Sequence, residues 1–198
     1  MTKIGFGIAS SFCTFEKVYI QMELLTKLGY NVIPIVNTPV ITWDTRFGKS
    51  EDVKKKIESI TGNKIVSTIV EAEKFGPKEQ LDLLIIAPAT GDFIASFANG
   101  ITNSPVTMAA KATLRNEKPI VIGVSTNDGL GMNGKNIMEL YNHKNIYFIP
   151  FGQDDFENKP NSLVAHYELL VPTIEKALDN KQLQPVIKEY VKTKNMGK

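Results

Sequence analysis

Short apolar runs alternate along the chain with longer segments in which apolar residues recur every three or four positions. In residues 15–28, for example, Val18, Met22 and Leu25 recur at the spacing of one helix face. The short runs predict strands at 4–8, 31–36, 65–69, 81–87, 119–124 and 146–150. The longer segments predict helices at 15–28, 50–60, 92–99, 104–114, 134–141 and 162–178, with loops at 37–49 and 151–160. Strands that alternate with helices favour an α/β fold with a three-layer, mostly parallel sheet and helices on both faces.

The loops that follow the predicted strands are the places where a site is expected. In sheets of this kind, ligands bind outside the carboxyl ends of the strands. That rule selects the loops at 9–14, 37–48, 88–93 and 125–133. The pattern shows no internal repeat and no shift in composition, so we expect one domain over residues 1–179 and a polar tail over 180–198.

Charge and hydropathy narrow the classes of partner. The chain has 23 basic and 21 acidic residues, and this near balance argues against a nucleic acid or a membrane surface as partner. The longest apolar runs fall short of the roughly 20 residues that a membrane helix needs. The first residues show no signal-peptide pattern.

Cysteine and histidine usage adds little chemistry. The single cysteine, Cys13, excludes an internal disulfide and favours a reducing cytoplasm. Cys13 lies close to a predicted ligand loop and is a candidate nucleophile, although we favour a small, partly buried side chain. His143 and His166 stand in separate segments without ligand spacing, so no metal site is expected.

Segment 83–114 carries the clearest sign of a ligand. An apolar strand breaks at Pro88 and leads into a helix start, where free backbone N–H groups can hold an anion. Gly5 and Gly7 match a dinucleotide loop poorly, because Ser10 takes the third glycine position and no acidic residue follows the second strand. The neutral donors at strand ends suit one phosphate of a mononucleotide, or else cap helices: Ser10, Ser11, Asn37, Thr38 and Thr90.

Three of these segments resemble motifs of a flavoprotein family. Residues 88–93 are similar to its Pro-Ala-Ser-Ala-Asn-Thr motif, 98–105 to the turn that follows it, and 7–11 to its glycine-containing start. The family includes peptidyl-cysteine and phosphopantothenoylcysteine decarboxylases and the flavin prenyltransferase. The resemblance implies a Rossmann/flavodoxin-like fold, FMN bound non-covalently and a homo-oligomer, trimeric or larger. With the donors above, it gives an expected FMN pocket of Ala9, Ser10, Ser11, Asn37, Thr38, Pro88, Ala89, Thr90, Ser125 and Thr126.

A closer resemblance covers nearly the whole chain. It rests on uncommon runs that resemble the family of second subunits of spore dipicolinate synthases: residues 45–49, 108–116, 125–128, 145–154, 159–165 and 182–186. This resemblance implies oxidation of a dihydrodipicolinate precursor in the mother-cell cytoplasm during sporulation. It also implies a partner, the dehydrogenase-like first subunit of dipicolinate synthase, which would hold NAD(P). Two alternatives stay open: an independent FMN enzyme acting on a small acid, and a non-enzymatic scaffold that stabilises its partner with a degenerate flavin pocket.

The chain departs from the decarboxylases and the prenyltransferase in its charged groups. No histidine precedes His143, and the second flavin motif, at 125–133, lacks the proline of the decarboxylases, so cysteine decarboxylation is not expected. The arginine that the prenyltransferase has near Met108 and its Arg-Glu pair near Thr126 and Asn127 are missing here, so prenyl phosphate chemistry is not expected either. A dicarboxylate substrate would need cations, and a ring oxidation would need a base. The catalytic residue stays unknown. The candidate cations are Arg46, Lys111 and Arg115. The candidate bases are Asp128 and Asp92, unless these residues only cap helices. Trp43 and Phe47 are candidates for stacking on the ring, although packing is favoured for Trp43.

Overall fold

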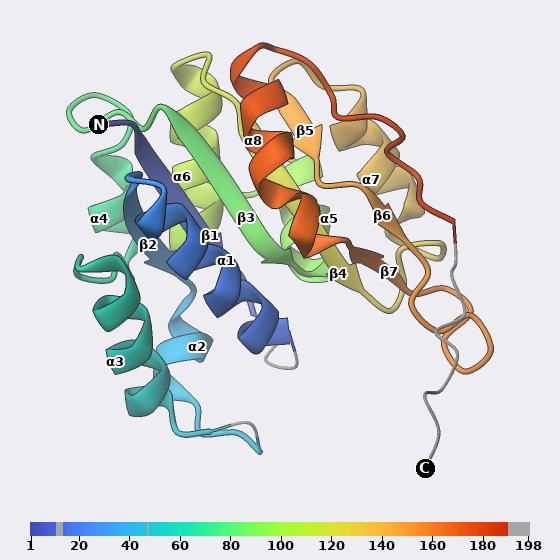
Figure 1. Ribbon diagram of the computed structural model, residues 1–198, viewed down its shortest axis with the longest axis horizontal. Coiled ribbons are helices and arrows are strands. Elements are labelled where there is room, and N and C mark those ends of the chain that lie inside the picture. Colours follow the sequence, from blue (N-terminus) through green and yellow to red (C-terminus); the bar gives the residue numbers. More distant parts are fainter. Residues whose placement is uncertain (11–13, 47, 190–198) are drawn as a thin grey trace.

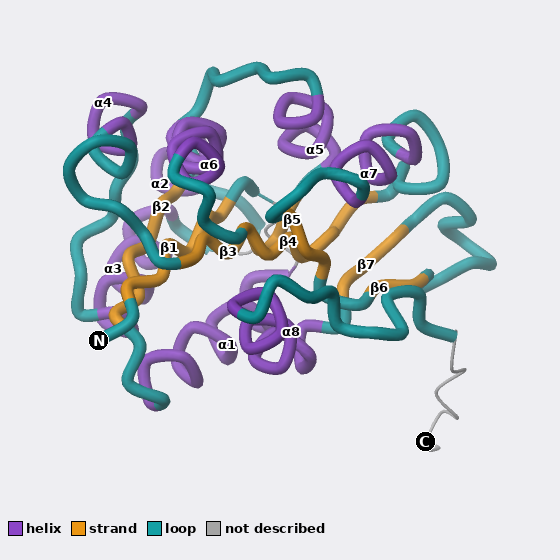
Figure 2. The backbone as a smooth tube through the Cα atoms, turned by 90° about the horizontal axis from the view of Figure 1, so that it is seen from above, coloured by secondary structure: helices purple, strands orange, loops and turns teal. Residues whose placement is uncertain are grey.

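Helices cover both faces of a central sheet in the computed structural model, which describes residues 1–10, 14–46 and 48–189 (Figure 1). The strands are β1 (Lys3–Ile8), β2 (Asn31–Val36), β3 (Leu83–Ala89), β4 (Ile120–Thr126), β5 (Ile146–Phe148), β6 (Phe151–Gly152) and β7 (Leu163–Ala165). The helices are α1 (Phe15–Lys27), α2 (Thr38–Thr42), α3 (Ser50–Thr61), α4 (Ile69–Glu73), α5 (Gly91–Ala98), α6 (Pro105–Arg115), α7 (Gly134–Tyr141), the 3-10 turn η2 (Tyr167–Leu169) and α8 (Leu170–Leu178). Figure 2 shows α1 and α8 on one face of the sheet, and α4, α5, α6 and α7 on the other.

The main part of the sheet is parallel, in the order β2-β1-β3-β4-β5. An antiparallel end, β7 followed by β6, extends from the last residues of β4, where Ser125 pairs with Val164. The predicted three-layer, mostly parallel fold is confirmed, with a mixed sheet of seven strands within the described residues. No helix in the described ranges is long and apolar enough to span a bilayer.

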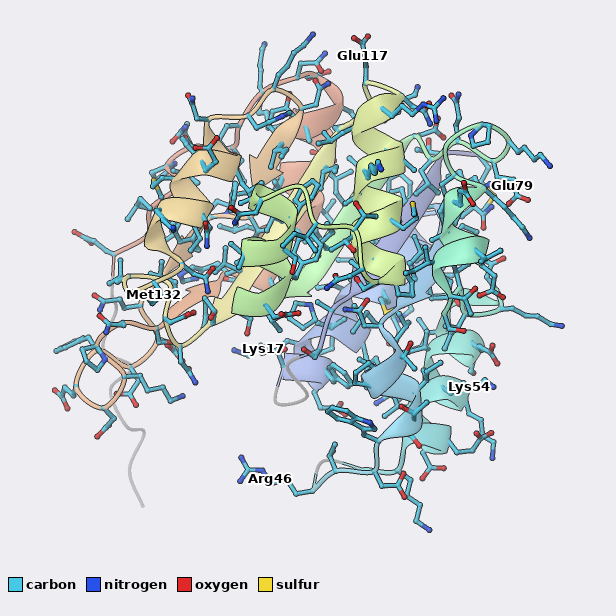
Figure 3. All side chains as sticks on the ribbon, turned by 180° about the vertical axis from the view of Figure 1, so that it is seen from behind. Lys17, Arg46, Lys54, Glu79, Glu117 and Met132 are labelled. Carbon is cyan, nitrogen blue, oxygen red and sulfur yellow. The ribbon has the colours of Figure 1, made fainter. Side chains whose placement is uncertain are left out.

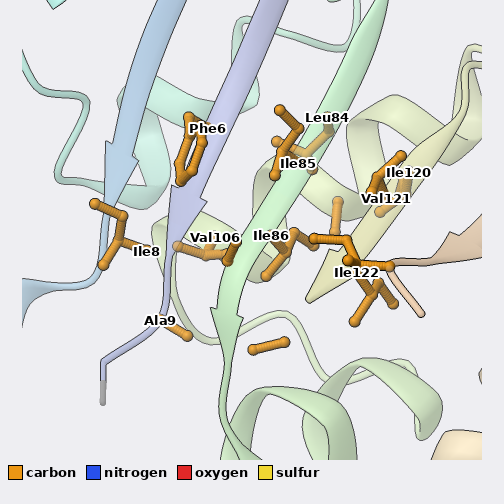
Figure 4. Packing of buried hydrophobic residues seen from close by; sticks show 14 of the residues in the cluster. Phe6, Ile8, Ala9, Leu84, Ile85, Ile86, Val106, Ile120, Val121 and Ile122 are labelled. Atoms are coloured by element: carbon orange, nitrogen blue, oxygen red, sulfur yellow. The ribbon is translucent and has the colours of Figure 1, made fainter. Parts of the chain in front are cut away.

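Continuous apolar runs account for the burial of the central strands. All seven residues of β3 are buried, which is typical of a parallel strand with helices on both faces. Figure 4 shows Phe6 of β1, Ile85 of β3 and Val121 of β4 side by side in this core. Gly7 lets α6 approach β1 closely, because a Cβ at Gly7 would lie 2.9 Å from Val106 Cγ1. This glycine therefore serves packing rather than a phosphate loop.

The strand predicted at 65–69 is wrong, because the structure keeps only one bridge there, between Ile35 and Val66. Side chains divert the backbone into helix α4 instead. The Thr68 hydroxyl accepts a hydrogen bond from the Glu71 N–H, and the Glu71 carboxylate accepts bonds from the N–H groups of Ser67 and Thr68, each at 3.0 Å. This capping box competes with strand pairing for the same backbone donors.

Glu71 makes the stability of this corner depend on pH. The backbone hydrogen bond from Ser67, with further bonds from Thr68, holds the pKa of Glu71 below its ordinary value, and partial burial opposes them only in part. A lowered folded-state pKa stabilises the fold above the ordinary pKa of 4.5, and this contribution is lost as the pH falls below it. We therefore expect wild type to be more stable than Glu71→Gln at about pH 6, and the difference to shrink toward about pH 3.

Denaturant unfolding across that pH range measures the difference. Glu73→Gln, on the same helix, is the control, because no hydrogen bond within the described residues involves the Glu73 carboxylate. A gap between wild type and Glu71→Gln that stays constant down to low pH would contradict the expectation.

The helix predicted at 162–178 is wrong in its first half. Residues 163–165 form β7 against β4 and β6, and α8 begins only at Leu170. Pro172 then lies in the first turn of α8, where a missing N–H breaks no intrahelical bond, whereas a helix from residue 162 would place it in the interior. The loop predicted at 37–49 also contains a short helix, α2, with Pro39 in its first turn.

The chain after α8 returns to the antiparallel end of the sheet. The Gln182 side chain exchanges two hydrogen bonds with the backbone of Phe148, at 2.8 and 2.7 Å. Farther on, the Phe151 N–H donates to the Val186 carbonyl, and the Lys188 N–H donates to the Phe151 carbonyl, both at 2.9 Å. Residues 182–188 therefore lie along β5 and β6.

Candidate functional site

The carboxyl ends of the parallel strands meet a cleft of about 430 Å³. From β1 the chain adds β2 on one side and β3 on the other, so the topological switch point lies between β1 and β3. Sheets of this class bind ligands at the switch point. Hydroxyl groups from four parts of the chain line this switch-point cleft: Thr14, Thr90, Ser125, Thr126 and Ser162. Two cations, Lys17 and Lys159, also line it. The donor set suits an anionic, oxygen-rich ligand.

Thr90 joins the end of β3 to α5. Its hydroxyl accepts a hydrogen bond from the Phe93 N–H at 3.3 Å, so Thr90 is the N-cap of α5 and also lines the cleft. Gly91, the first residue of the helix, lines the cleft beside it. The N–H groups of a first helical turn have no partner within the helix and favour an anion. The helix start that the sequence indicated therefore lies at the cleft.

A hydrogen-bonded cluster packs directly against Gly91. The Asp128 carboxylate accepts bonds from the Thr126 hydroxyl and from Asn133 Nδ2, the latter at 2.8 Å. A Cβ at Gly91 would lie 2.7 Å from Asn133 Nδ2 and 2.9 Å from both Thr126 Oγ1 and Asp128 Oδ1. Glycine is therefore the residue that fits here. Both Asp128 oxygens take part in this cluster, which we call the Asp128 cluster, and they shape the 126–133 loop.

The other predicted pocket residues lie at the same edge of the sheet, with different surroundings. Ala9 is buried at the end of β1 and Ser10 follows it. The Asn37 side-chain oxygen accepts a hydrogen bond from the Val106 N–H at 3.4 Å, which ties the end of β2 to the start of α6, and Thr38 opens α2. Pro88 and Ala89 are buried in β3, Asp92 is exposed on α5, and Ser11, Cys13 and Phe47 lie outside the described residues.

The start of α6 is already satisfied by protein groups. Ser104 and Thr107 form a capping box, Pro105 has no N–H to donate, and the Val106 N–H is held by Asn37. Of the two helix starts in segment 83–114, the start of α5 is therefore the one that can offer backbone donors to a ligand in the cleft.

The structure does not bring the three predicted substrate cations into the cleft. Arg46 extends from the loop between α2 and α3 at the edge of the molecule (Figure 3). Lys111 lines a separate cavity of about 340 Å³ with Glu139 and His143. Arg115 ends α6 and lies at the opposite end of that helix from the cleft. Trp43 is 62 % exposed on the Arg46 loop, and its role stays a prediction.

Sequence reasoning missed the cations that do line the cleft. Lys17 lies near the start of α1 (Figure 3). It comes one helical turn after Thr14, which also lines the cleft, and that spacing was the available signal. Within the described ranges Lys17 forms no ion pair or hydrogen bond through its side chain. Lys159 Nζ lies 3.9 Å from Asp154 Oδ2, and Lys159 reaches the cleft because β7, predicted as helix, pairs with β4.

Comparison with known proteins identifies the family. The sequence model of the flavoprotein family matches residues 2–149. The B subunit of dipicolinate synthase from Bacillus subtilis (strain 168) is 53 % identical over 187 residues, 94 % of each chain. The crystal structure of the B subunit of dipicolinate synthase from Bacillus halodurans C superposes with a TM-score of 0.89 at 55 % identity, covering 96 % of this chain and 97 % of that one.

More distant structures share the fold alone. The FMN-dependent cysteine decarboxylase SpaF has a TM-score of 0.62 at 19 % identity, covering 90 % of this chain and 96 % of the other. The FMN-binding protein AtHal3 has the same TM-score at 14 % identity, with 88 % and 95 % covered. From the family match and the identity over nearly the full length, the chain belongs to the flavoprotein family and, within it, to the family of dipicolinate synthase B subunits.

Proposed function

We propose that this chain is the flavin-binding B subunit of a dipicolinate synthase. With the dehydrogenase-like A subunit, which holds NAD(P), it oxidises dihydrodipicolinate to dipicolinate in the mother-cell cytoplasm during sporulation. The observation that carries the proposal is the switch-point cleft, in which hydroxyls and Lys17 surround the start of α5, in a chain 53 % identical to a B subunit of this enzyme. The proposed assembly is a homo-oligomer that also binds the A subunit.

The residues of the cleft fit FMN. The cleft has a volume of about 430 Å³, which lies in the range of small-molecule sites. The first turn of α5, Thr90 and Lys17 would hold the phosphate, because N–H donors, a hydroxyl and an ammonium group are the partners that a phosphate prefers. Ser125 and Thr126 line the same cleft, and the Thr126 hydroxyl oxygen, whose proton goes to Asp128, would accept a hydrogen bond from the polar chain of the cofactor. When bound, FMN supplies a two-electron acceptor.

The chain's own part in the reaction is to bind and orient. Loss of two hydrogens from a dihydropyridine ring gives an aromatic product, so the ring chemistry supplies the driving force and the protein must position the reacting groups. The fixed hydroxyls and the helix start can do this without a strongly charged catalytic residue. Asp128 shapes the cleft in this proposal, since both of its carboxylate oxygens are engaged within the Asp128 cluster.

Titration of the purified full chain with FMN, followed by quenching of flavin fluorescence, tests the cofactor. We expect saturable binding to wild type and binding about 10-fold weaker to Lys17→Met, which loses one charge-assisted contact worth about 1.5 kcal/mol. Lys27→Met, in the last turn of the same helix, is the matched control and should bind FMN like wild type.

The same preparation tests the partner. Dipicolinate formation that starts only when a dehydrogenase-like subunit is added supports the proposal. Activity of this chain alone would favour the independent flavoenzyme. If the purified chain is colourless and leaves FMN fluorescence unchanged, the proposed cofactor is contradicted and the non-enzymatic scaffold is favoured.

A further inference from the structure

A second cavity, of about 340 Å³, adjoins the switch-point cleft. It lies between α1 on one side and β6, β7 and η2 on the other, and we call it the α1–β7 pocket. Lys17, Asp154 and Val164 line both cavities, so the two spaces are neighbours along one continuous wall. A ligand in the α1–β7 pocket would therefore lie next to a cofactor in the cleft.

Gln21 indicates that the α1–β7 pocket receives a polar ligand. The residue is only 8 % exposed, it lines the pocket, and within the described residues its side chain has no hydrogen bond. Its carboxamide atoms still reach the space of the pocket, so they can bind water there or donate to the oxygen acceptors of a ligand that replaces this water.

His166 adds a second polar group on the opposite wall. Its Nδ1 lies 3.1 Å from Glu168 Oε1, and this contact sets the orientation of the ring. The other ring nitrogen, Nε2, lies on the side of Gly152, which also lines the pocket. With Nδ1–H donating to that carboxylate, Nε2 is the atom available to a ligand, and it donates to an anion when the imidazole is protonated. Lys17 adds a cation from α1.

The two carboxylates of the pocket are already engaged by the chain. Asp154 accepts a hydrogen bond from the Ser162 hydroxyl at 2.7 Å and lies 3.9 Å from Lys159, while Glu168 holds His166. Gln21 and His166 thus remain as polar groups that can bind a ligand, and Lys17 lies at the border with the cleft. Gln21 donates to carboxylate oxygens through its amide group, and His166 does so as an imidazolium.

From this arrangement we infer that the α1–β7 pocket binds the small aromatic dicarboxylate that is the product of the proposed reaction, and its dihydro precursor. The inference rests on the proposed function for the identity of the ligand, whereas the pocket and its donors come from the structure. Donors on two facing walls suit a ligand with two carboxylates better than one with a single carboxylate. The assignment replaces Lys111, Arg115 and Arg46 with Gln21 and His166 as the substrate-binding residues, and Lys17 lies between this pocket and the cleft.

Calorimetric titration of the full chain, without FMN and with metal ions removed, tests this with pyridine-2,6-dicarboxylate as the probe. We expect one binding site per chain, and binding about 10-fold weaker for pyridine-2-carboxylate, for Gln21→Leu and for His166→Asn, since each loses about one charge-assisted or buried hydrogen bond. Gln21→Glu should weaken binding further by repulsion. His143→Asn, which changes the other histidine of the chain, should bind like wild type.

Several results would overturn the inference. The first is that wild type does not bind the dicarboxylate, and the second is that folded Gln21→Leu, Gln21→Glu and His166→Asn bind it as tightly as wild type. The third is that Lys111→Met, rather than these variants, loses binding. The fourth is that the dicarboxylate displaces FMN one for one, which would mean that both ligands occupy the same site. Circular dichroism establishes that each variant is folded. The FMN titration distinguishes this inference from the proposed function. Dicarboxylate binding without FMN binding would support the ligand assigned to the pocket and contradict the proposed cofactor. FMN binding without dicarboxylate binding would support the cofactor and contradict the ligand assigned to the pocket.

Discussion

Replacing Phe93 by alanine is expected to lower the free energy of unfolding by about 3–5 kcal/mol, because the truncated side chain leaves a cavity in a closed part of the core. Phe93 is 2 % exposed and its ring lies against that of Phe97, with 5.4 Å between centroids. It anchors the first turn of α5, which borders the switch-point cleft. The loss should therefore destabilise the helix that forms one wall of the candidate site.

Denaturant unfolding of the purified variants measures this change. Met132→Ala is the control for an exposed apolar side chain, since Met132 is 81 % exposed (Figure 3), and it should change stability by no more than about 0.5 kcal/mol. The loss in the free energy of unfolding for Phe93→Leu should lie between those of Phe93→Ala and Met132→Ala. A loss below about 1 kcal/mol for Phe93→Ala would mean that α5 is not packed as described.

Gly91→Ala is expected to lower the free energy of unfolding by about 1–3 kcal/mol, the usual effect of overpacking, and to weaken FMN binding. The added Cβ would enter the Asp128 cluster at 2.7 to 2.9 Å from three polar atoms, so the loop at 126–133 or the start of α5 must move. Either movement disturbs the wall of the cleft that would hold the phosphate. The effect therefore reports on the site as well as on stability.

Gly131→Ala is the matched control in the same loop, because a Cβ there would meet its nearest neighbour at an ordinary 3.5 Å. It should leave both stability and FMN affinity nearly unchanged. In a double-mutant cycle, Asn133→Ala should relieve part of the effect of Gly91→Ala, so that the two losses sum to more than the loss in the double variant. Equal behaviour of Gly91→Ala and Gly131→Ala would refute the packing role of Gly91.

Hydrophobic periodicity was sufficient to predict the parallel part of the fold. The strands at 4–8, 31–36 and 81–87 and the helices at 15–28, 50–60 and 134–141 agree with the structure to within a few residues, because their burial follows directly from the pattern. The failures occur where local side chains or distant pairing decide. At 65–69, where a strand was predicted, the Thr68–Glu71 capping box starts helix α4 instead. At 163–165, where a helix was predicted, pairing with β4 forms strand β7.

The candidate site was predictable only in the part that follows from strand ends. Thr90, Ser125 and Thr126 lie in the loops that follow predicted strands, and the structure brings them together in one cleft. The cations were not predictable in the same way, because charge along the sequence does not tell which end of a helix faces the site. Lys111 and Arg115 lie on α6 away from the cleft. Lys17 lines it because α1 starts there, and Lys159 and His166 depend on the antiparallel strand that the sequence pattern concealed.

The return of residues 182–188 to the sheet has a consequence for solubility. β6 ends the antiparallel side of the sheet, and an open strand edge offers its backbone donors and acceptors to any other chain. Here Val186 and Lys188 take up both the N–H and the carbonyl of Phe151, so that position cannot recruit a foreign strand. The last described part of the chain thus protects the protein against edge-to-edge aggregation.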